Sequence, residues 1–252
     1  MMRLIVVTAG TLFISFVVFM TVKMWGRSQT FIDYNRAFYK TESTPLLFKV
    51  ASSKQEEFAK QLQEFDNLYL NVATTLDQRL ILVKTNLAAQ ASYRSKSYDQ
   101  VATEVIELVK FKDELQNKKL IFNMTENAIA GHEIFIGELQ KLELDKSENI
   151  VVTSPYDVMA KSVKELRPTL LYATSQPEIL RIKAMESMNL IEAVSFRADI
   201  LIHPRTYYKQ IFFTDDLLTE LKRRHVRIIV GPDSQEELEK AKSLNPFALI
   251  EM

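Results

Sequence analysis

Short apolar runs and longer amphipathic segments alternate along most of the chain. From residue 45 onward, runs rich in Val, Ile, Leu and Phe are each followed by a stretch whose apolar residues recur at helical spacing. Short apolar runs predict buried strands, and the helical spacing predicts amphipathic helices. Eight strands are expected, at residues 46–50, 68–72, 120–124, 150–153, 170–173, 200–203, 227–230 and 247–250.

Alternating strands and helices imply a parallel sheet. Eight such units in about two hundred residues predict an α/β fold, the (β/α)₈ TIM barrel. An open, doubly wound sheet is the alternative. A further apolar run at residues 80–83 is interpreted as a hairpin partner of the second strand, and residues 88–98 as a loop or insertion. Residues 99–117 predict one helix with its apolar positions on one side, namely Val101, Val105, Leu108, Val109 and Leu115.

The first apolar run differs from the others in length. Residues 4–22 are uncharged and mostly apolar, close to the roughly 20 residues that a helix needs to cross a bilayer. Trp25 follows the run, where interfacial aromatic residues are common. A cleaved secretory signal is the alternative, but the run is long for a signal core and no small-x-small cleavage site follows it. The predicted organisation is a transmembrane anchor over residues 1–25, a juxtamembrane linker over 26–44 and a barrel over 45–252.

The orientation of this anchor is left open by the charges that flank it. Arg3 and the amino terminus lie before it, and Lys23, Arg27, Arg36 and Lys40 lie after it. The positive-inside rule therefore favours a cytoplasmic barrel. Anchors with so short an N-terminal tail commonly keep their amino end inside, which favours an extracytoplasmic barrel. We expect a single-pass membrane protein, with the extracytoplasmic placement as the working hypothesis.

Composition removes several classes of function. The chain has 252 residues and no cysteine, so disulfides, thiolate metal sites and thiol catalysis are excluded. The formal net charge is +0, so the protein has no overall positive electrostatic field that would favour a nucleic-acid partner. With only 5 glycines, and neither GxGxxG nor a Walker-type loop, a phosphate-cradling nucleotide site is not expected.

Three segments carry a family resemblance through their order and spacing. LYLNV (68–72), LIFNM (120–124) and RIIVGPD (227–233) follow one another as the glycerophosphodiester phosphodiesterase family places its Glu-x-Asp strand, its Glu-x-Lys strand and its last barrel unit. From residue 46 to its end the chain resembles that family, whose fold is the PLC-like phosphodiesterase TIM barrel. The resemblance implies a phosphoric diester hydrolase fold with a role in lipid metabolism.

The residues at the family's functional positions differ from the family pattern. The Glu-x-Asp pair falls on Tyr69 and Asn71, and the glutamate of Glu-x-Lys falls on Asn123. In the family, three carboxylates hold a divalent metal, and Mg²⁺ and Ca²⁺ prefer anionic oxygen ligands. We therefore expect no metal and no cofactor.

The two histidines that serve the family as acid and base are also replaced. The first, which opens a His-Arg-Gly motif, falls on Phe48 with Lys49 after it, and the second falls on Lys84. Phenylalanine cannot transfer a proton, and a lysine acts as a base only when its pKa is strongly lowered. The resemblance therefore implies a catalytically inactive member, a pseudoenzyme.

Other side chains are candidates for ligand binding. His203 ends a predicted strand, at the end of the barrel where such folds place their sites. Lys49, Lys84 and Arg205 are expected on the same rim, and three cations without carboxylates between them can hold a phosphate group. Ordinary rim lysines and a loop-anchoring histidine are the alternatives.

Three hypotheses follow. The first is an inactive, membrane-anchored barrel that binds a phosphorylated small molecule or a protein partner. The second is an active phosphodiesterase with a remodelled, metal-independent site on Lys84, His203 and Arg205. It gains support if two of five carboxylates converge with His203 in one cavity: Glu56, Glu57, Asp77, Glu126 and Asp233. The third is an assembly partner whose surface matters more than its pocket, in which case a large exposed apolar patch is expected.

Overall fold

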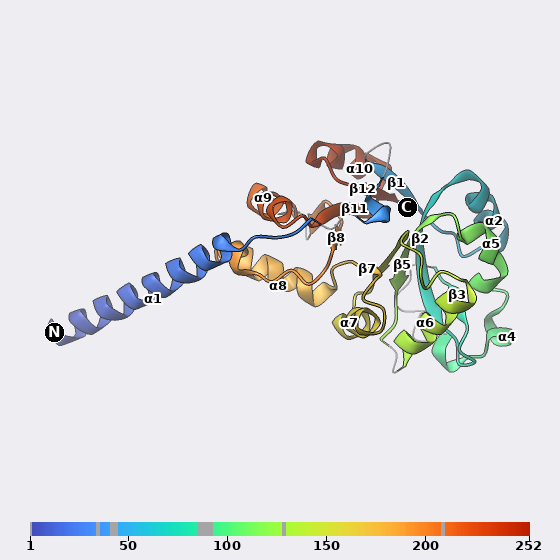
Figure 1. Cartoon of the computed structure of the whole chain (residues 1–252), viewed down its shortest axis with the longest axis horizontal. Helices are drawn as coiled ribbons and strands as arrows, with labels where there is room; N and C mark the ends of the chain where they lie inside the picture. The colour runs from blue at the N-terminus through green and yellow to red at the C-terminus, as the bar shows by residue number, and fades with distance from the viewer. Residues whose placement is uncertain (1, 34–35, 41–44, 85–92, 128–129, 208–209) are drawn as a thin grey trace.

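The structure is a computed structural model that describes residues 2–33, 36–40, 45–84, 93–127, 130–207 and 210–252, with the side chains of 2–6 left out. Figure 1 shows two parts: a rounded body and one long helix, α1 (Met2–Ser28), that projects away from it on the side of α8 and α9. The body holds the sheet and all of the other helices.

Eight parallel strands form the barrel. Around it the order is β7-β6-β5-β2-β1-β12-β11-β8, and a parallel bridge between Ala173 and Ile200 joins the two ends of this series. The predicted TIM barrel is therefore confirmed, and the open-sheet alternative is wrong because β8, at one end of this series, meets the segment after β7 at the other end. The strands are β1 (Leu46–Val50), β2 (Asn67–Thr74), β5 (Lys119–Met124), β6 (Ile150–Thr153), β7 (Leu171–Tyr172), β8 (Ile200–His203), β11 (Arg227–Asp233) and β12 (Ala248–Glu251).

Helices cover the outside of the barrel (Figure 1). Their apolar faces pack on the outward side chains of the strands in two clusters, one under α2, α6 and α7 and one under α8, α9 and α10. These clusters explain the helical spacing of apolar residues in the sequence. The helices are α2 (Gln55–Glu64), α6 (Gly131–Lys141), α7 (Asp157–Leu166), α8 (Gln176–Ser187), α9 (Asp215–Arg223) and α10 (Gln235–Ala241).

The single helix predicted over residues 99–117 is wrong. This stretch contains α4 (Tyr98–Val101), β4 (Ile106–Glu107), the 3₁₀ turn η3 (Leu108–Phe111) and α5 (Lys112–Leu115). Its apolar residues serve two different clusters, because Val101 and Val105 pack under the hairpin strand β3 (Leu80–Leu82), whereas Leu108 and Leu115 join the outer core of the barrel. The predicted pairing of β3 with β2 is confirmed. Of the predicted loop 88–98, residues 88–92 lie outside the described residues.

The interior of the barrel is filled by side chains from alternate positions of the strands. Phe48, Tyr69, Ile121 and Ile200 belong to this inner cluster and are at most 5% exposed. Such filling is usual for an eight-stranded barrel, which is a packed core and not a pore. A binding site cannot therefore form inside the barrel, whereas its two ends are open to one.

The amino-terminal end of the barrel, its base, is closed by a residue from the predicted linker. Phe38, in the 3₁₀ turn η1 (Ala37–Tyr39), is fully buried, with its ring centroid 6.0 Å from that of Phe48 and 5.8 Å from that of Phe247. The Lys119 ammonium donates to the carbonyl oxygens of Phe38 and Lys40, both at 2.8 Å. We call Phe38 the base plug.

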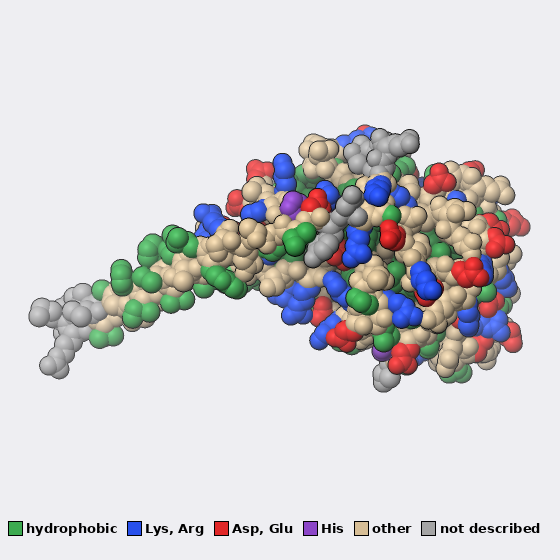
Figure 2. All heavy atoms as spheres, viewed as in Figure 1, with side chains coloured by type: hydrophobic (Ala, Val, Ile, Leu, Met, Phe, Trp, Pro, Cys, Tyr) green, Lys and Arg blue, Asp and Glu red, His purple; other side chains and the backbone are tan. Residues whose placement is uncertain are grey.

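The helix α1 has the length and composition of a membrane span. Val7–Ser28 is long and apolar enough to cross a bilayer, and its apolar window is not buried inside the structure. Figure 2 shows hydrophobic side chains along the described part of α1. The hydroxyls of Thr11 and Thr21 donate to the carbonyl oxygens of Val7 and Val17, so these polar groups are satisfied within the helix.

Candidate functional site

A cleft of about 360 Å³ opens at the carboxyl end of the barrel strands, which we call the mouth. Five neighbouring strands each bring a polar residue to it at or near their carboxyl ends: Asn71 from β2, Asn123 from β5, Thr153 from β6, Thr174 after β7 and His203 from β8. Parallel strands end at the same edge, so these side chains meet although they are far apart in the sequence. The mouth is the place where the fold can present a site.

Two amides form the floor of this cleft. Asn71 and Asn123 are register partners on β2 and β5, and the Asn123 Nδ2 donates to the Asn71 Oδ1 at 2.8 Å. Tyr69 lies two residues before Asn71, on the same face of β2, and is 5% exposed. Burial raises the pKa of the Tyr69 phenol, so this group is neutral at physiological pH.

His203 is held by its neighbours in one orientation. Its ring stacks on Phe212 with centroids 3.7 Å apart, and Tyr207 meets its edge at 5.2 Å. Its Nδ1 lies 2.8 Å from the carbonyl oxygen of Pro204, which places the ring proton on that nitrogen in the neutral form. Burial lowers the pKa of the imidazole; the Pro204 hydrogen bond opposes this, and the Lys183 ammonium adds to the lowering. At neutral pH the His203 ring is uncharged.

A stability measurement tests the state of His203. Because the folded pKa lies below the unfolded value, the unfolded chain takes up the proton first as the pH falls. The contribution of neutral His203 is fully present above about pH 6.5, the ordinary histidine pKa, and is lost as the pH falls below it. We expect the stability advantage of the wild type over His203→Gln to shrink between pH 7.5 and pH 5, measured by denaturant unfolding. An advantage that grows as the pH falls would contradict a buried neutral ring.

Gly231 shapes the mouth on the side of β11. Its φ is +119°, and a β-carbon there would lie 2.4 Å from the carbonyl oxygen of Ile250. Only glycine fits this backbone. The Gly231–Pro232 bend interrupts the register of β11 with β12, so that both residues line the cleft.

No charged Asp, Glu, Lys or Arg side chain is among the described residues that line the cleft. Its polar groups are amides, hydroxyls and the His203 ring. Nor do the residues that the structure describes contain a group of three His, Asp or Glu side chains that could hold a metal ion. The donor set at Tyr69, Asn71 and Asn123 does not fit a hard divalent cation, because it offers only neutral oxygens.

The structure does not gather the four predicted phosphate ligands. His203 lines the cleft, but Lys49 points outward from β1, where its ammonium lies 3.0 Å from the carbonyl oxygen of Met252 and 3.5 Å from the Glu251 carboxylate. Arg205 is paired with Glu237 of α10 at 2.9 Å. Lys84 is exposed beyond the end of β3 and does not line the cleft.

The other residues weighed from the sequence are also away from the cleft. Phe48 is fully buried inside the barrel, next to the base plug. The five candidate carboxylates do not line the cavity that holds His203. Glu126 accepts hydrogen bonds from the Thr74 amide and hydroxyl, and burial raises its pKa against the lowering effect of those bonds. The remodelled-site hypothesis therefore gains no carboxylate from the geometry.

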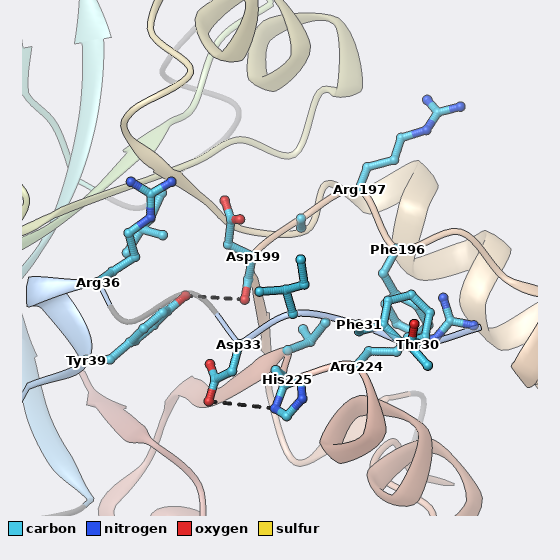
Figure 3. Close-up of a pocket in the computed structure, with 14 residues that line it drawn as sticks. Thr30, Phe31, Asp33, Arg36, Tyr39, Phe196, Arg197, Asp199, Arg224 and His225 are labelled. Carbon is cyan, nitrogen blue, oxygen red and sulfur yellow. Dashed lines mark hydrogen bonds and ion pairs between the residues drawn. The ribbon is translucent and has the colours of Figure 1, made fainter. Parts of the chain in front are cut away.

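A second hollow of about 360 Å³ lies at the base of the barrel, between the linker and the strand starts. Figure 3 shows its charged residues: Asp33 faces His225 at 3.7 Å, and the Tyr39 hydroxyl lies 3.5 Å from the carbonyl oxygen of Asp199. The Arg224 guanidinium stacks over Phe31 and Phe196, 4.7 and 4.8 Å from their ring centroids. This hollow could not be predicted from the sequence, because one of its walls is the segment expected to be only a linker.

Fold and mouth together define a (β/α)₈ barrel with a polar cleft at the carboxyl ends of its strands. No protein-family model and no curated protein sequence matches the chain.

Solved structures do match. A glycerophosphoryl diester phosphodiesterase domain from Mycobacterium tuberculosis superposes with a TM-score of 0.64 at 10% identity, over 82% of this chain and 96% of that one. The glycerophosphodiester phosphodiesterase of Parabacteroides distasonis superposes with a TM-score of 0.59 at 14% identity, over 81% of this chain and 92% of that one. An Oleispira antarctica phosphodiesterase, solved with its product sn-glycerol-3-phosphate, superposes with a TM-score of 0.53 at 14% identity, over 82% of this chain and 92% of that one. At such identities the comparisons establish the shared fold.

Proposed function

We propose that this protein is a membrane-anchored barrel of the phosphodiesterase fold that binds a ligand at its mouth without hydrolysing it. The observation that carries the proposal is the absence of charged side chains among the described residues lining the cleft. A phosphodiester reaction develops charge on oxygen, and proteins stabilise that charge with cations or metal ions placed against it. Among the residues that the structure describes, neither the metal ligands nor a cationic substitute faces this cleft.

The lining groups suit an uncharged, hydroxyl-bearing part of a ligand. Amides and hydroxyls donate and accept hydrogen bonds, and the rings of His203 and Tyr207 offer flat apolar surfaces. An ionised phosphate would find no Lys or Arg among the described lining residues, because Lys49, Lys84 and Arg205 lie elsewhere. We therefore favour a neutral polar ligand, or a protein segment that presents such groups, over the phosphorylated ligand expected from the sequence.

One experiment with two readouts tests this function. The full-length chain in detergent is incubated with glycerophosphocholine and Mg²⁺ or Ca²⁺, and ligand-observed NMR follows both hydrolysis and the binding of glycerol and sn-glycerol 3-phosphate. We expect no metal-dependent hydrolysis and no preference for the phosphate ester.

Three variants and the metal dependence of turnover separate the possible outcomes. If hydrolysis occurs without metal and is lost in Lys84→Ala or His203→Gln, the remodelled enzyme is correct. Metal-dependent turnover overturns the binding proposal outright. A preference for the phosphate ester that disappears in Arg205→Gln restores the phosphate site predicted from the sequence.

A further inference from the structure

The last turn of α1 is joined to the body by direct backbone contact. A β-carbon on Gly26 would lie 2.3 Å from the carbonyl oxygen of Glu192, so only glycine allows this approach. The Arg223 guanidinium, at the end of α9, donates to the carbonyl oxygens of Gly26 at 3.0 Å and Gln29 at 2.8 Å. These are carbonyls that the end of a helix leaves without an intrahelical partner. The end of α1 is therefore seated on the body.

Charged side chains reinforce this seat. Glu192 is 8% exposed, and its carboxylate lies 2.7 Å from the Arg27 guanidinium and 3.7 Å from the Lys23 ammonium. Lys23 also donates to the Asn189 Oδ1 at 2.8 Å. Without α1, Glu192 would lose both of these cations, and an unpaired buried charge is strongly unfavourable. The seat therefore fixes which side of the barrel faces the bilayer that α1 would cross: the side of α8, the 3₁₀ turn η4 (Ile191–Ala193) and α9.

The surface around this seat combines exposed apolar and cationic side chains. Trp25, Ile32 and Met188 are 63%, 72% and 53% exposed. Arg197 and Lys222 are exposed as well. We call these five residues the root surface.

Three glutamates near the root surface point inward. Glu186, Glu192 and Glu220 have side chains that are 12%, 11% and 5% exposed, each paired with a Lys or Arg. Asp33 is more exposed, at 47%, but is paired with Arg227. Asp215 and Asp216, at the start of α9, are exposed, so the surface is not uniformly positive and its outward cations are Arg197 and Lys222.

The root surface also lies at the right depth. Six residues separate Val22, the end of the apolar run, from Ser28, which at 1.5 Å per residue is about 9 Å along the helix. The headgroup layer on each side of a bilayer is roughly 5–8 Å thick. Side chains grouped around the end of α1 therefore reach the level of the lipid phosphates.

We propose that the barrel rests on the bilayer through the root surface, and that Arg197 and Lys222 bind the phosphates of anionic phospholipids there. Cations near an anionic membrane surface are attracted to it, and aromatic and aliphatic side chains bury at the same level. The inference rests on the proposed membrane anchoring by α1. It adds that the barrel is held in a fixed pose and is not tethered loosely.

The cysteine-free sequence allows a direct test on the full-length chain. Single cysteines at Met188, Ile32 and Lys60 carry a fluorophore, and the protein is placed in phospholipid nanodiscs with nitroxide-labelled headgroups. Lys60, exposed on α2 at the far side of the body, is the matched control (Figure 1). We expect several-fold stronger quenching at positions 188 and 32 than at 60. Quenching at 188 should increase with phosphatidylglycerol and decrease with high salt.

Further variants separate this proposal from the anchoring on which it rests. Phe13→Cys, in the middle of α1, reports insertion through nitroxides on the acyl chains. If Phe13 is quenched but Met188 and Ile32 behave like Lys60, the fixed pose is overturned and the anchor stands; if Phe13 is not quenched, both fail. Gly26→Leu should weaken quenching at Met188 while leaving Phe13 unchanged, and no change at Met188 would show that the seat does not hold the barrel.

The double variant Arg197→Gln, Lys222→Gln tests the two cations. It should remove the salt-sensitive part of the quenching at position 188, and a salt response that persists would overturn the assignment of these cations.

Discussion

Replacing Phe38 by alanine is expected to lower the free energy of unfolding of the body by about 3–5 kcal/mol, the usual cost of removing a buried phenylalanine ring. Phe38 is fully buried, and it contacts three other rings at the base of the barrel, those of Tyr39, Phe48 and Phe247. Removing its ring leaves a cavity among them, and the cost depends on how far these neighbours relax into it. Thermal or denaturant unfolding of the full-length chain in detergent measures the change.

The matched control for the base plug is Ile32→Ala. Ile32 belongs to the same segment but is 72% exposed, so its truncation should change the stability by less than about 0.5 kcal/mol. Phe38→Leu should fall between the two. If Phe38→Ala costs no more than Ile32→Ala, the segment before β1 is only a tether. In that case a chain that begins at residue 45 should be as stable as the body of the full-length protein.

Introducing three carboxylates at the mouth is expected to give the barrel a divalent-cation site. The combined variant is Tyr69→Glu, Asn71→Asp and Asn123→Glu. Asn71 and Asn123 already touch at 2.8 Å, and Tyr69 lies beside them, so the three new side chains would meet in one place. Without metal they repel one another and destabilise the fold; Ca²⁺ or Mg²⁺ should reverse this.

The size of that reversal follows from mass action. Metal at one hundred times its Kd would stabilise the variant by about 2.7 kcal/mol. Calorimetry and the metal dependence of Tm measure it, with Tyr69→Gln and Asn123→Gln as the uncharged control of similar size. A variant that is indifferent to both metals would show that the mouth has lost the geometry as well as the charge. Hydrolysis is not expected, because Phe48 and Lys84, which the family resemblance places at the acid and base positions, do not line the cleft.

The barrel could be predicted from the sequence because each of its strands is a short apolar run and its neighbours in the sheet follow mostly in chain order. Residues 150–153 and 200–203 match β6 and β8 exactly in their bounds. The prediction of one helix over residues 99–117 was wrong because a helical pattern of apolar residues was not a sufficient signal there. Its apolar spacing is helical, but Val105 and Leu108 pack in different clusters, and periodicity cannot reveal which cluster a side chain will join.

The candidate site could be predicted in part. His203 and the Asn71–Asn123 pair follow from strand ends, and Thr153 and Thr174 could have been found in the same way as the polar residues that close apolar runs. Lys49 and Arg205 are also near strand ends, yet they point away, because side chains alternate between the two faces of a strand and turn outward after it. The role of Phe38 could not be predicted, since no local pattern marks a lone aromatic residue that fills a distant barrel.

The contact between Phe38 and Phe247 sets a condition on the synthesis of the chain. These residues lie about two hundred positions apart in the sequence, and β1 pairs with β12, the last strand of the barrel. Such distant contacts cannot form until the chain has been translated through β12. The nascent barrel must therefore keep its first aromatic residues uncovered while the ribosome adds the strands in between. Protection from aggregation during that interval has to come from the early strand pairs or from a chaperone.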